Sequence, residues 1–177
     1  MFVWIGIDVD NQLEEVKAFT RRAEESIGFD HSNFTLPFHI SLKTSFEVDS
    51  DVYPHVIDTI LDYFEQIEPF DVDVSGIEYH DTIVWIRMSE SLTVNRIHDD
   101  LDRIMLERFG VPRHEYDLDY MFHTTLFMDE NKQKISKAYE RVKDASIPSR
   151  LHARKLLIGA SETGALGTYK VTHVIDI

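Results

Sequence analysis

A five-residue pattern that occurs twice is the feature that most constrains this chain. Phe38-His39-Ile40-Ser41-Leu42 is followed 84 residues later by Phe122-His123-Thr124-Thr125-Leu126. In both copies apolar and polar residues alternate, which is typical of a β-strand with one face toward a core. The polar face of the first copy carries His39, Ser41 and Lys43 in one row. Two such strands predict a site assembled from two halves of the chain.

The spacing of the other expected elements also repeats. Gly28 and Gly110, each expected to end a helix, lie 82 residues apart. Outside the histidine strands little residue identity between the halves is expected. The periodicity predicts helices over residues 11–27, 53–67, 91–109 and 132–145, a hairpin over 70–88 with its turn near His80-Asp81, and closing strands over 151–160 and 167–177.

Together these elements predict an α+β fold. A strand, helix and strand unit that occurs twice can form two lobes related by a pseudo-two-fold axis. We expect one domain over residues 1–177, with repeat halves of approximately 1–80 and 81–177. In this fold two antiparallel-rich sheets flank a central cleft, with the helices outside, and each lobe contributes one histidine strand to the cleft.

Composition narrows the class of protein. With 43% hydrophobic residues, 7 Gly and 5 Pro in 177 residues, the chain can bury a core and is not typical of a disordered protein. The absence of cysteine excludes disulfides, thiolate metal ligands and cysteine nucleophiles. Residues 1–8 carry no basic leader, and no later apolar run approaches about 18 residues. A cytoplasmic protein without membrane contact is therefore expected.

The charge limits the expected partners. The net charge is −14, with 32 acidic and 18 basic residues. Because an acidic surface repels polyphosphate backbones, binding of duplex DNA or of extended nucleic acid is not expected. A small anionic ligand in a locally basic cleft remains compatible with this charge. Nothing in the sequence indicates a protein partner or an oligomeric state.

Two histidines that face each other suit phosphodiester hydrolysis without a metal or other cofactor. Because imidazole titrates near neutral pH, one member can be neutral and remove a proton while the other is protonated and donates one. The hydroxyls of Ser41 and Thr125 lie two residues beyond His39 and His123, on the same strand faces, and could bind the phosphoryl oxygens. We predict that these four residues form the site.

Several further residues are weaker candidates. Lys43 could attract phosphate, although its counterpart in the second copy is Phe127, and a solvated strand lysine is the simpler interpretation. Tyr116 and Tyr120, in the loop before the second histidine strand, could contact the substrate by stacking on a nucleobase. His80 also precedes a threonine by two residues, but it falls at the expected turn. The remaining histidines form no ligand pattern such as His-x-x-x-His, so no metal site is expected.

The paired motifs resemble those of the 2H phosphoesterase superfamily, the group of 2′-5′ RNA ligase-like proteins and 2′,3′-cyclic nucleotide phosphodiesterases. The resemblance covers nearly the whole chain, including the hairpin at 70–88 and the final strand at Gly167-Thr168-Tyr169. It implies that His39 and His123 are catalytic and that Ser41 and Thr125 bind phosphate. Many ligase-like members carry a basic residue after the second motif, where this chain has Phe127-Met128-Asp129. Long RNA is therefore not the expected substrate.

The expected activity is hydrolysis of a 2′,3′-cyclic phosphate or a 2′-5′ linkage in a small nucleotide or short RNA end. The reverse reaction would be ligation of RNA ends. A module that binds nucleotides or RNA ends in the same cleft without chemistry is the alternative. The loops at 29–36 and 113–120 would determine the substrate. The near-symmetry of the halves leaves both acid and base assignments open for the two histidines.

Overall fold

The structure, a computed structural model, describes residues 1–29 and 35–177. Residues 30–34, which belong to the expected loop at 29–36, lie outside the described residues. Within the described residues eight strands form two sheets, and their bounds are β1 Phe2–Asp8, β2 His39–Glu47, β3 Phe70–His80, β4 Ile83–Met88, β5 His123–Met128, β6 Arg150–Ala153, β7 Lys155–Ser161 and β8 Lys170–Asp176.

The two sheets have matching strand orders. One sheet runs β2-β1-β7-β8 and the other runs β5-β4-β3-β6, with antiparallel neighbours throughout. Exchanging β1 with β4, β2 with β5, β7 with β3, and β8 with β6 turns the first order into the second. The histidine strands β2 and β5 are therefore equivalent edge strands. The predicted α+β duplication is confirmed, whereas the half boundary near residue 80 stays a prediction.

Two helices end at the glycines expected to stop them, whereas the helices expected over 53–67 and 132–145 end three residues earlier, at Phe64 and Val142. Their bounds are α1 Glu14–Ile27, α2 Tyr53–Phe64, α3 Leu92–Phe109 and α4 Lys132–Val142, with short 3-10 helices η1 at Asp10–Gln12 and η3 at Glu115–Asp117. Gly28 and Gly110 end α1 and α3 in the left-handed region, at φ 75° and 68°. Asn131 caps α4, since its side chain accepts from the backbone N–H groups of Gln133 and Lys134.

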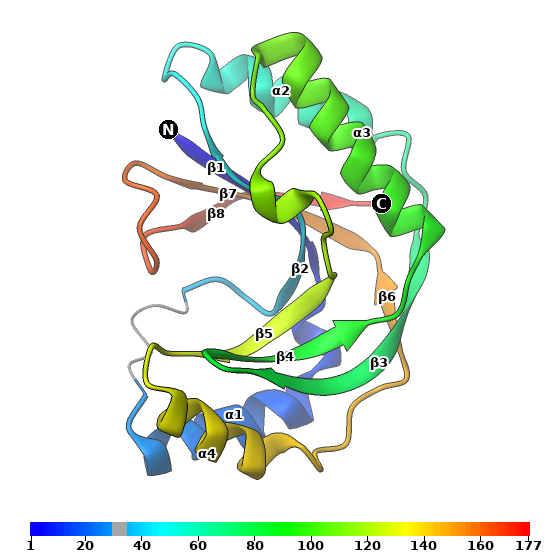
Figure 1. Ribbon diagram of the computed structural model, residues 1–177. Helices are drawn as coiled ribbons and strands as arrows, with labels where there is room; N and C mark the ends of the chain where they lie inside the picture. Colours follow the sequence, from blue (N-terminus) through cyan, green and yellow to red (C-terminus); the bar gives the residue numbers. More distant parts are fainter. Residues whose placement is uncertain (30–34) are drawn as a thin grey trace.

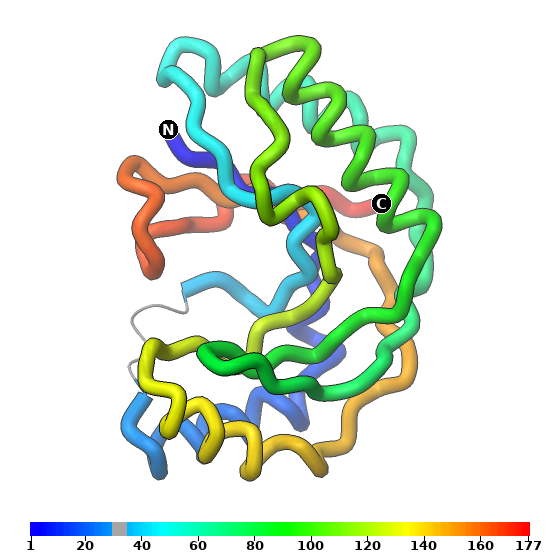
Figure 2. The backbone as a smooth tube through the Cα atoms, in the orientation of Figure 1, coloured from blue at the N-terminus to red at the C-terminus, as the bar shows by residue number. Residues whose placement is uncertain are grey.

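The chain crosses between the lobes on its way from each first strand to its helix. After β1, α1 lies beside α4 under the sheet of β3, β4 and β5, and after β4, α3 lies beside α2 near β2 (Figure 1). The tube drawing follows these two crossings without interruption (Figure 2). Each half thus supplies a helix to the lobe that contains the other half's first strand.

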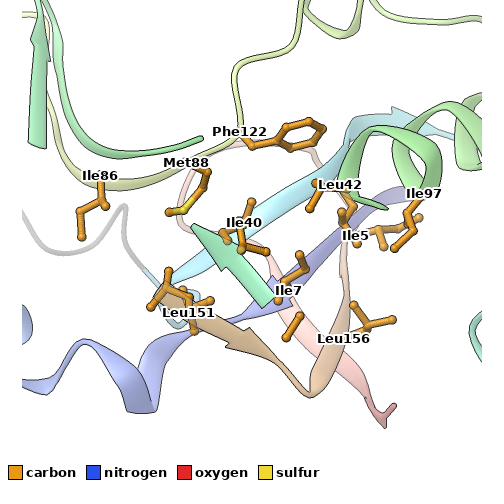
Figure 3. Close-up of a cluster of buried hydrophobic side chains, with 14 of the residues drawn as sticks. Ile5, Ile7, Ile40, Leu42, Ile86, Met88, Ile97, Phe122, Leu151 and Leu156 are labelled. Carbon is orange, nitrogen blue, oxygen red and sulfur yellow. The ribbon is translucent and has the colours of Figure 1, made fainter. Parts of the chain in front are cut away.

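The core is continuous across both sheets. One cluster of buried side chains includes Ile5 and Ile40 from the first sheet and Ile86 and Leu151 from the second. Figure 3 shows these residues in one region together with Met88. Because apolar burial is the main stabilising contribution to folding, this shared core holds the two lobes together as one unit.

One expected strand is divided in the structure. Residues 151–160 were expected to form a single strand, but β6 pairs with β3 and β7 pairs with β1. Arg154 and Lys155, two consecutive exposed polar residues, interrupt the alternation where the chain passes from one sheet to the other. Within residues 1–29 and 35–177, no helix has the length and apolar character required to cross a bilayer.

Candidate active site

The two histidine strands meet at the edge of each sheet. The Thr124 hydroxyl of β5 donates to the backbone carbonyl of His39 in β2 at 3.1 Å. Thr124 is fully buried, so this bond is shielded from water. It links the second motif to the first and places His39 and His123 on neighbouring strands of opposite lobes.

Both histidines are anchored in the same way. His39 Nδ1 lies 2.7 Å from the carbonyl oxygen of Pro37, and His123 Nδ1 lies 2.6 Å from that of Met121. A carbonyl oxygen can only accept, so Nδ1 carries the hydrogen in each ring. Nε2 is then the nitrogen left for a substrate in both halves. It acts as a base when neutral and as an acid when protonated.

Burial keeps both imidazoles neutral. Desolvation lowers the pKa of His39 to about 4, and the nearby His123 adds to this decrease, whereas the Pro37 carbonyl opposes it. Desolvation also lowers the pKa of His123, with a smaller contribution from His80 and an opposing one from the Met121 carbonyl. At neutral pH the free site therefore holds two neutral rings, and a bound anion favours protonation of one of them.

A tryptophan packs against each of these histidines. The rings of Trp4 and His39 have centroids 4.2 Å apart, and those of Trp85 and His123 are 4.3 Å apart. Both indoles are buried and come from the equivalent strands β1 and β4. The indole N–H groups of the two tryptophans have different acceptors. That of Trp4 donates from Nε1 to Ser41 Oγ at 2.9 Å.

A cavity of about 280 Å³ adjoins the motifs and is lined by His39, Ser41 and Thr125. Its apolar and aromatic wall includes Trp4, Phe38, Leu126, Met128, Leu166 and Tyr169. Among the described residues of this wall there is one carboxylate, that of Glu24, and no lysine or arginine. The wall does not include His123, which lies two residues before Thr125 on the same face of β5. The cavity thus suits an uncharged, planar or apolar group next to the two hydroxyls.

The two motif histidines have oppositely charged partners, because Asp8 of β1 is paired with His39 and Arg87 of β4 is paired with His123. Arg87 is the β4 partner of His123, and directly paired residues project from the same face of a sheet. Arg87 Nη1 lies 3.3 Å from Glu78 Oε1, and His80 Nε2 lies 3.6 Å from Glu78 Oε2. His80, expected in the turn, is the last residue of β3 and its ring packs 4.5 Å from that of Trp85. The pairing therefore puts an acidic residue beside His39 and a basic one beside His123.

Lys43 does not belong to the exposed row in which it was expected. The β1–β2 register shifts between Gly6↔Ser41 and Ile5↔Lys43, so a bulge turns the Lys43 side chain inward. The residue is 1% exposed, and its Nζ lies 2.6 Å from Asp102 Oδ1 and 2.8 Å from Asp117 Oδ2. The expectation that Lys43 contacts substrate is therefore wrong. Instead, the lysine ties β2 to α3 and to η3.

The two loop tyrosines have different positions. Tyr116 is 70% exposed and packs on His114, away from the cavity wall. Tyr120 is half-buried, with its ring stacked 5.2 Å from His98 and 6.1 Å from His123. Burial raises the pKa of Tyr120 to about 12, although a hydrogen bond with Ser41 opposes the increase. Tyr120 is likewise not part of the cavity wall, so a contact between Tyr120 and substrate stays a prediction. A contact between Tyr116 and substrate stays a prediction.

Residue identity between the halves extends beyond the histidine strands, contrary to expectation. Val3-Trp4-Ile5 in β1 recurs as Val84-Trp85-Ile86 in β4, 81 residues later. These contain the only two tryptophans of the chain, and the spacing agrees with those of the glycines and histidines. The sequence therefore held a signal for both tryptophans. Arg87 had no such signal, because pairing across strands places it near the site, whereas Tyr169, expected in the final strand, lies just before β8 and lines the cavity.

In residues 1–29 and 35–177 no three His, Asp or Glu side chains gather in an arrangement that could hold a metal ion. The histidines of the two motifs are instead satisfied by backbone carbonyls and packed against tryptophans.

Solved structures with the same fold were found by structural comparison. TT0787 of Thermus thermophilus matches with a TM-score of 0.64 at 15% identity, covering 99% of this chain and 97% of that one. Escherichia coli LigT complexed with 3′-AMP matches with a TM-score of 0.63 at 13% identity and the same coverage. Kluyveromyces marxianus Usb1 matches with a TM-score of 0.52 at 12% identity, covering 99% and 98%. At these identities the similarity establishes the fold.

The sequence itself establishes the family. A comparison with curated proteins gave no match. The family model of the 2′-5′ RNA ligase superfamily, however, matches residues 8–164, which include both histidine motifs and the strands that carry them. This superfamily is generally enzymatic and of phosphoesterase type. The chain belongs to the 2′-5′ RNA ligase superfamily, within the 2H phosphoesterases that its paired motifs resemble.

Proposed function

We propose that this protein is a metal-independent phosphodiesterase that acts on a 2′,3′-cyclic phosphate or a 2′-5′ linkage in a small nucleotide. The observation that carries the proposal is the identical anchoring of the two motif histidines. In each ring Nδ1 is bound to a backbone carbonyl, so both Nε2 atoms are left for the substrate. A pair of imidazoles with that freedom can remove one proton and supply another.

The reaction on a cyclic phosphate would proceed as follows. A neutral histidine takes a proton from water, whose oxygen forms a bond to phosphorus. The bond from phosphorus to one ribose oxygen breaks, and the protonated histidine gives its proton to that oxygen. The product carries a phosphomonoester and a free hydroxyl, and the two histidines exchange protons with water before the next cycle. Since the pKa of His39 is lowered to about 4, His39 is neutral at pH 7 and is our candidate for the base.

Ser41 and Thr125 would bind the non-bridging oxygens of the phosphate. Both line the cavity, and they come from opposite lobes. Hydroxyl donors aimed at oxygens that gain charge in the transition state accelerate such reactions. A bound phosphate would also favour protonation of His123, the candidate acid. His123 shares β5 with Thr125 and is paired with Arg87 of β4.

The cavity supports a small substrate. Its volume of about 280 Å³ is near the lower limit for ligand sites, and its aromatic and apolar wall suits an uncharged base. The net charge of −14 disfavours long RNA. Structures of E. coli LigT with 3′-AMP, ATP and NADP+ indicate that proteins of this fold bind nucleotides.

A hydrolysis panel in the presence of EDTA tests the proposal. We expect turnover of at least one 2′,3′-cyclic or 2′-5′-linked nucleotide, and loss of turnover in His39→Ala and in His123→Ala with the fold intact. His55→Ala, at an exposed histidine of α2, is the matched control. A single motif variant that keeps near-full activity would rule out the acid–base pair. Activity that EDTA removes and a divalent ion restores would rule out metal independence.

The panel also separates hydrolysis from binding alone. A cleft that binds these nucleotides without turning any of them over would indicate the non-catalytic binding module. RNA ends carrying a 2′,3′-cyclic phosphate and a 5′-hydroxyl, supplied at high concentration, test the reverse ligation. Product with a 2′-5′ linkage would show that the same pair of histidines works in both directions.

A further inference from the structure

The two tryptophans lie in equivalent strands, each packed on one motif histidine, but give their N–H groups to different partners. Trp4 Nε1 donates to Ser41 Oγ, a hydroxyl of the first motif, at 2.9 Å. Trp85 Nε1 donates to Glu78 Oε2 at 3.4 Å, and so leaves Thr125, the hydroxyl of the second motif, without this bond. The two halves of the site are therefore alike in their histidines and different in their hydroxyls.

Two glycines set the position of the Trp4 ring. Gly159 is the β7 partner of Trp4, and a Cβ there would lie 2.8 Å from Trp4 Cε3. A Cβ on Gly6 would also collide with the six-membered ring. The indole can therefore lie close against the backbone with its N–H turned toward Ser41. In the other half the corresponding neighbours of Trp85 are Glu78 and Arg87, which form an ion pair instead.

The bond from Trp4 limits what the Ser41 hydroxyl can do. An indole N–H can only donate, so Ser41 Oγ must be the acceptor in this bond. The single Ser41 hydrogen cannot point at Trp4 and is left for another acceptor. Ser41 lines the cavity, where that acceptor would be a phosphoryl oxygen. When Ser41 Oγ accepts the bond from Trp4, the O–H bond of Ser41 becomes more polarised. The hydrogen bond that Ser41 donates is then stronger.

Tyr120 adds a second partner for the same oxygen. Burial raises the pKa of Tyr120 to about 12 and keeps its hydroxyl protonated, whereas the contact with Ser41 lowers that pKa, as expected where Ser41 is the donor in the free protein. When Ser41 gives its hydrogen to a phosphate, Tyr120 can donate to the remaining lone pair of Oγ. Both lone pairs are then occupied by protein donors.

We propose that Trp4 is a positioning residue that makes Ser41 an obligate hydrogen-bond donor to the substrate phosphate, and that Thr125 is not set in this way by Trp85. The two motifs then bind the phosphate unequally, although they carry the same residue types. The inference rests on the proposed function for the identity of the anion. Its physical content, a Trp4–Ser41 bond coupled to phosphate binding, can be measured without turnover.

The sharpest test replaces each indole by benzothienylalanine, which keeps the two-ring shape and lacks the N–H group. At position 4 we expect kcat/KM for 2′,3′-cyclic AMP to fall by about 5- to 10-fold, which corresponds to the loss of about one hydrogen bond. In a Ser41→Ala background the same replacement should cause no further loss. At position 85, in contrast, the effect of the benzothienylalanine replacement and the effect of Ser41→Ala should be additive. Additive effects at position 4 would overturn the proposal.

A second measurement needs only inorganic phosphate. The chain has two tryptophans and so gives two indole N–H signals in a ¹H–¹⁵N spectrum, which Trp4→Phe and Trp85→Phe assign. Phosphate should shift the Trp4 signal more than the Trp85 signal, and Ser41→Ala should abolish that difference. A Trp4 signal that does not respond to saturating phosphate would contradict the inference. A responsive Trp4 signal in a protein that hydrolyses no nucleotide would support the inference while contradicting the proposed function.

Discussion

The hydroxyl of Thr124 donates to the backbone carbonyl of His39, 85 residues earlier, at 3.1 Å. This bond joins the edge strands β2 and β5 of the two sheets at the point where the motif histidines meet. Since Thr124 is fully buried, no water can replace the lost partner. The spacing of the two histidines therefore depends on a residue whose side chain faces away from the substrate.

Replacing Thr124 by valine should loosen the two strands. We expect Thr124→Val to lower the free energy of unfolding by about 1–2 kcal/mol, because the His39 carbonyl loses its donor in a buried position. Turnover should fall several-fold, since misplaced catalytic groups lose effective concentration. Urea denaturation and kcat check these two expectations. Thr172→Val removes a hydroxyl bond to Ile158 within one sheet and should leave kcat unchanged. Equal kcat losses in both variants would contradict this account.

The lowered pKa of His39 predicts an acid-sensitive fold. The unfolded chain binds a proton at His39 below about pH 6.5, but the folded protein does so only near pH 4. The stabilisation is therefore complete above pH 6.5 and is lost as the pH falls toward 4, by about 3 kcal/mol in all. In urea titrations at pH 7 and pH 4.5, His39→Asn should lose less stability on acidification than the wild type. An equal loss in both proteins would show that His39 does not contribute.

Lys43 should be critical for stability rather than for phosphate binding. Lys43→Met leaves Asp102 and Asp117 buried without their shared cation, and we expect a loss of about 3–5 kcal/mol. Lys155, which pairs with Asp176 at the surface at 3.9 Å, is the control, and Lys155→Met should cost less than about 1 kcal/mol. Thermal and urea unfolding measure both. A Lys43→Met protein as stable as the wild type would contradict the assignment.

We expect Arg87, which also pairs with Glu78 at 3.3 Å, to supply the positive charge that the segment after the second motif lacks. Because its side chain shares a face of the sheet with His123, Arg87→Met should weaken binding of inorganic phosphate by about 3- to 10-fold, and more strongly at low salt. Arg103→Met, on an exposed face of α3, should leave binding unchanged. Calorimetry at two salt concentrations makes the comparison. An equal effect of the two substitutions would indicate a general charge effect instead.

The sequence was most informative where the fold repeats itself. The spacing of the histidine strands and of Gly28 and Gly110 predicted the duplication, because these residues mark the same element in each half. The inward turn of Lys43 was not predictable from alternation, because a bulge depends on how β2 pairs with β1. The division of residues 151–160 likewise depends on which sheet each segment joins. The Val-Trp-Ile repeat is visible in the sequence, but its role follows only from the structure, in which each indole packs on a motif histidine.

The exchange of helices between the lobes has a consequence for the chain as a whole. Either half alone would lack elements that complete its sheet, because β7 of the second half pairs with β1, β3 of the first half pairs with β4, and α3 packs against β2. The arrangement resembles a dimer that has exchanged elements and then been joined by a linker. Cutting the chain at the Asp81 turn should therefore give two fragments that are insoluble apart and that restore the fold only when combined. Such joined halves need not remain identical, and the different partners of Trp4 and Trp85 are one way in which they have become specialised.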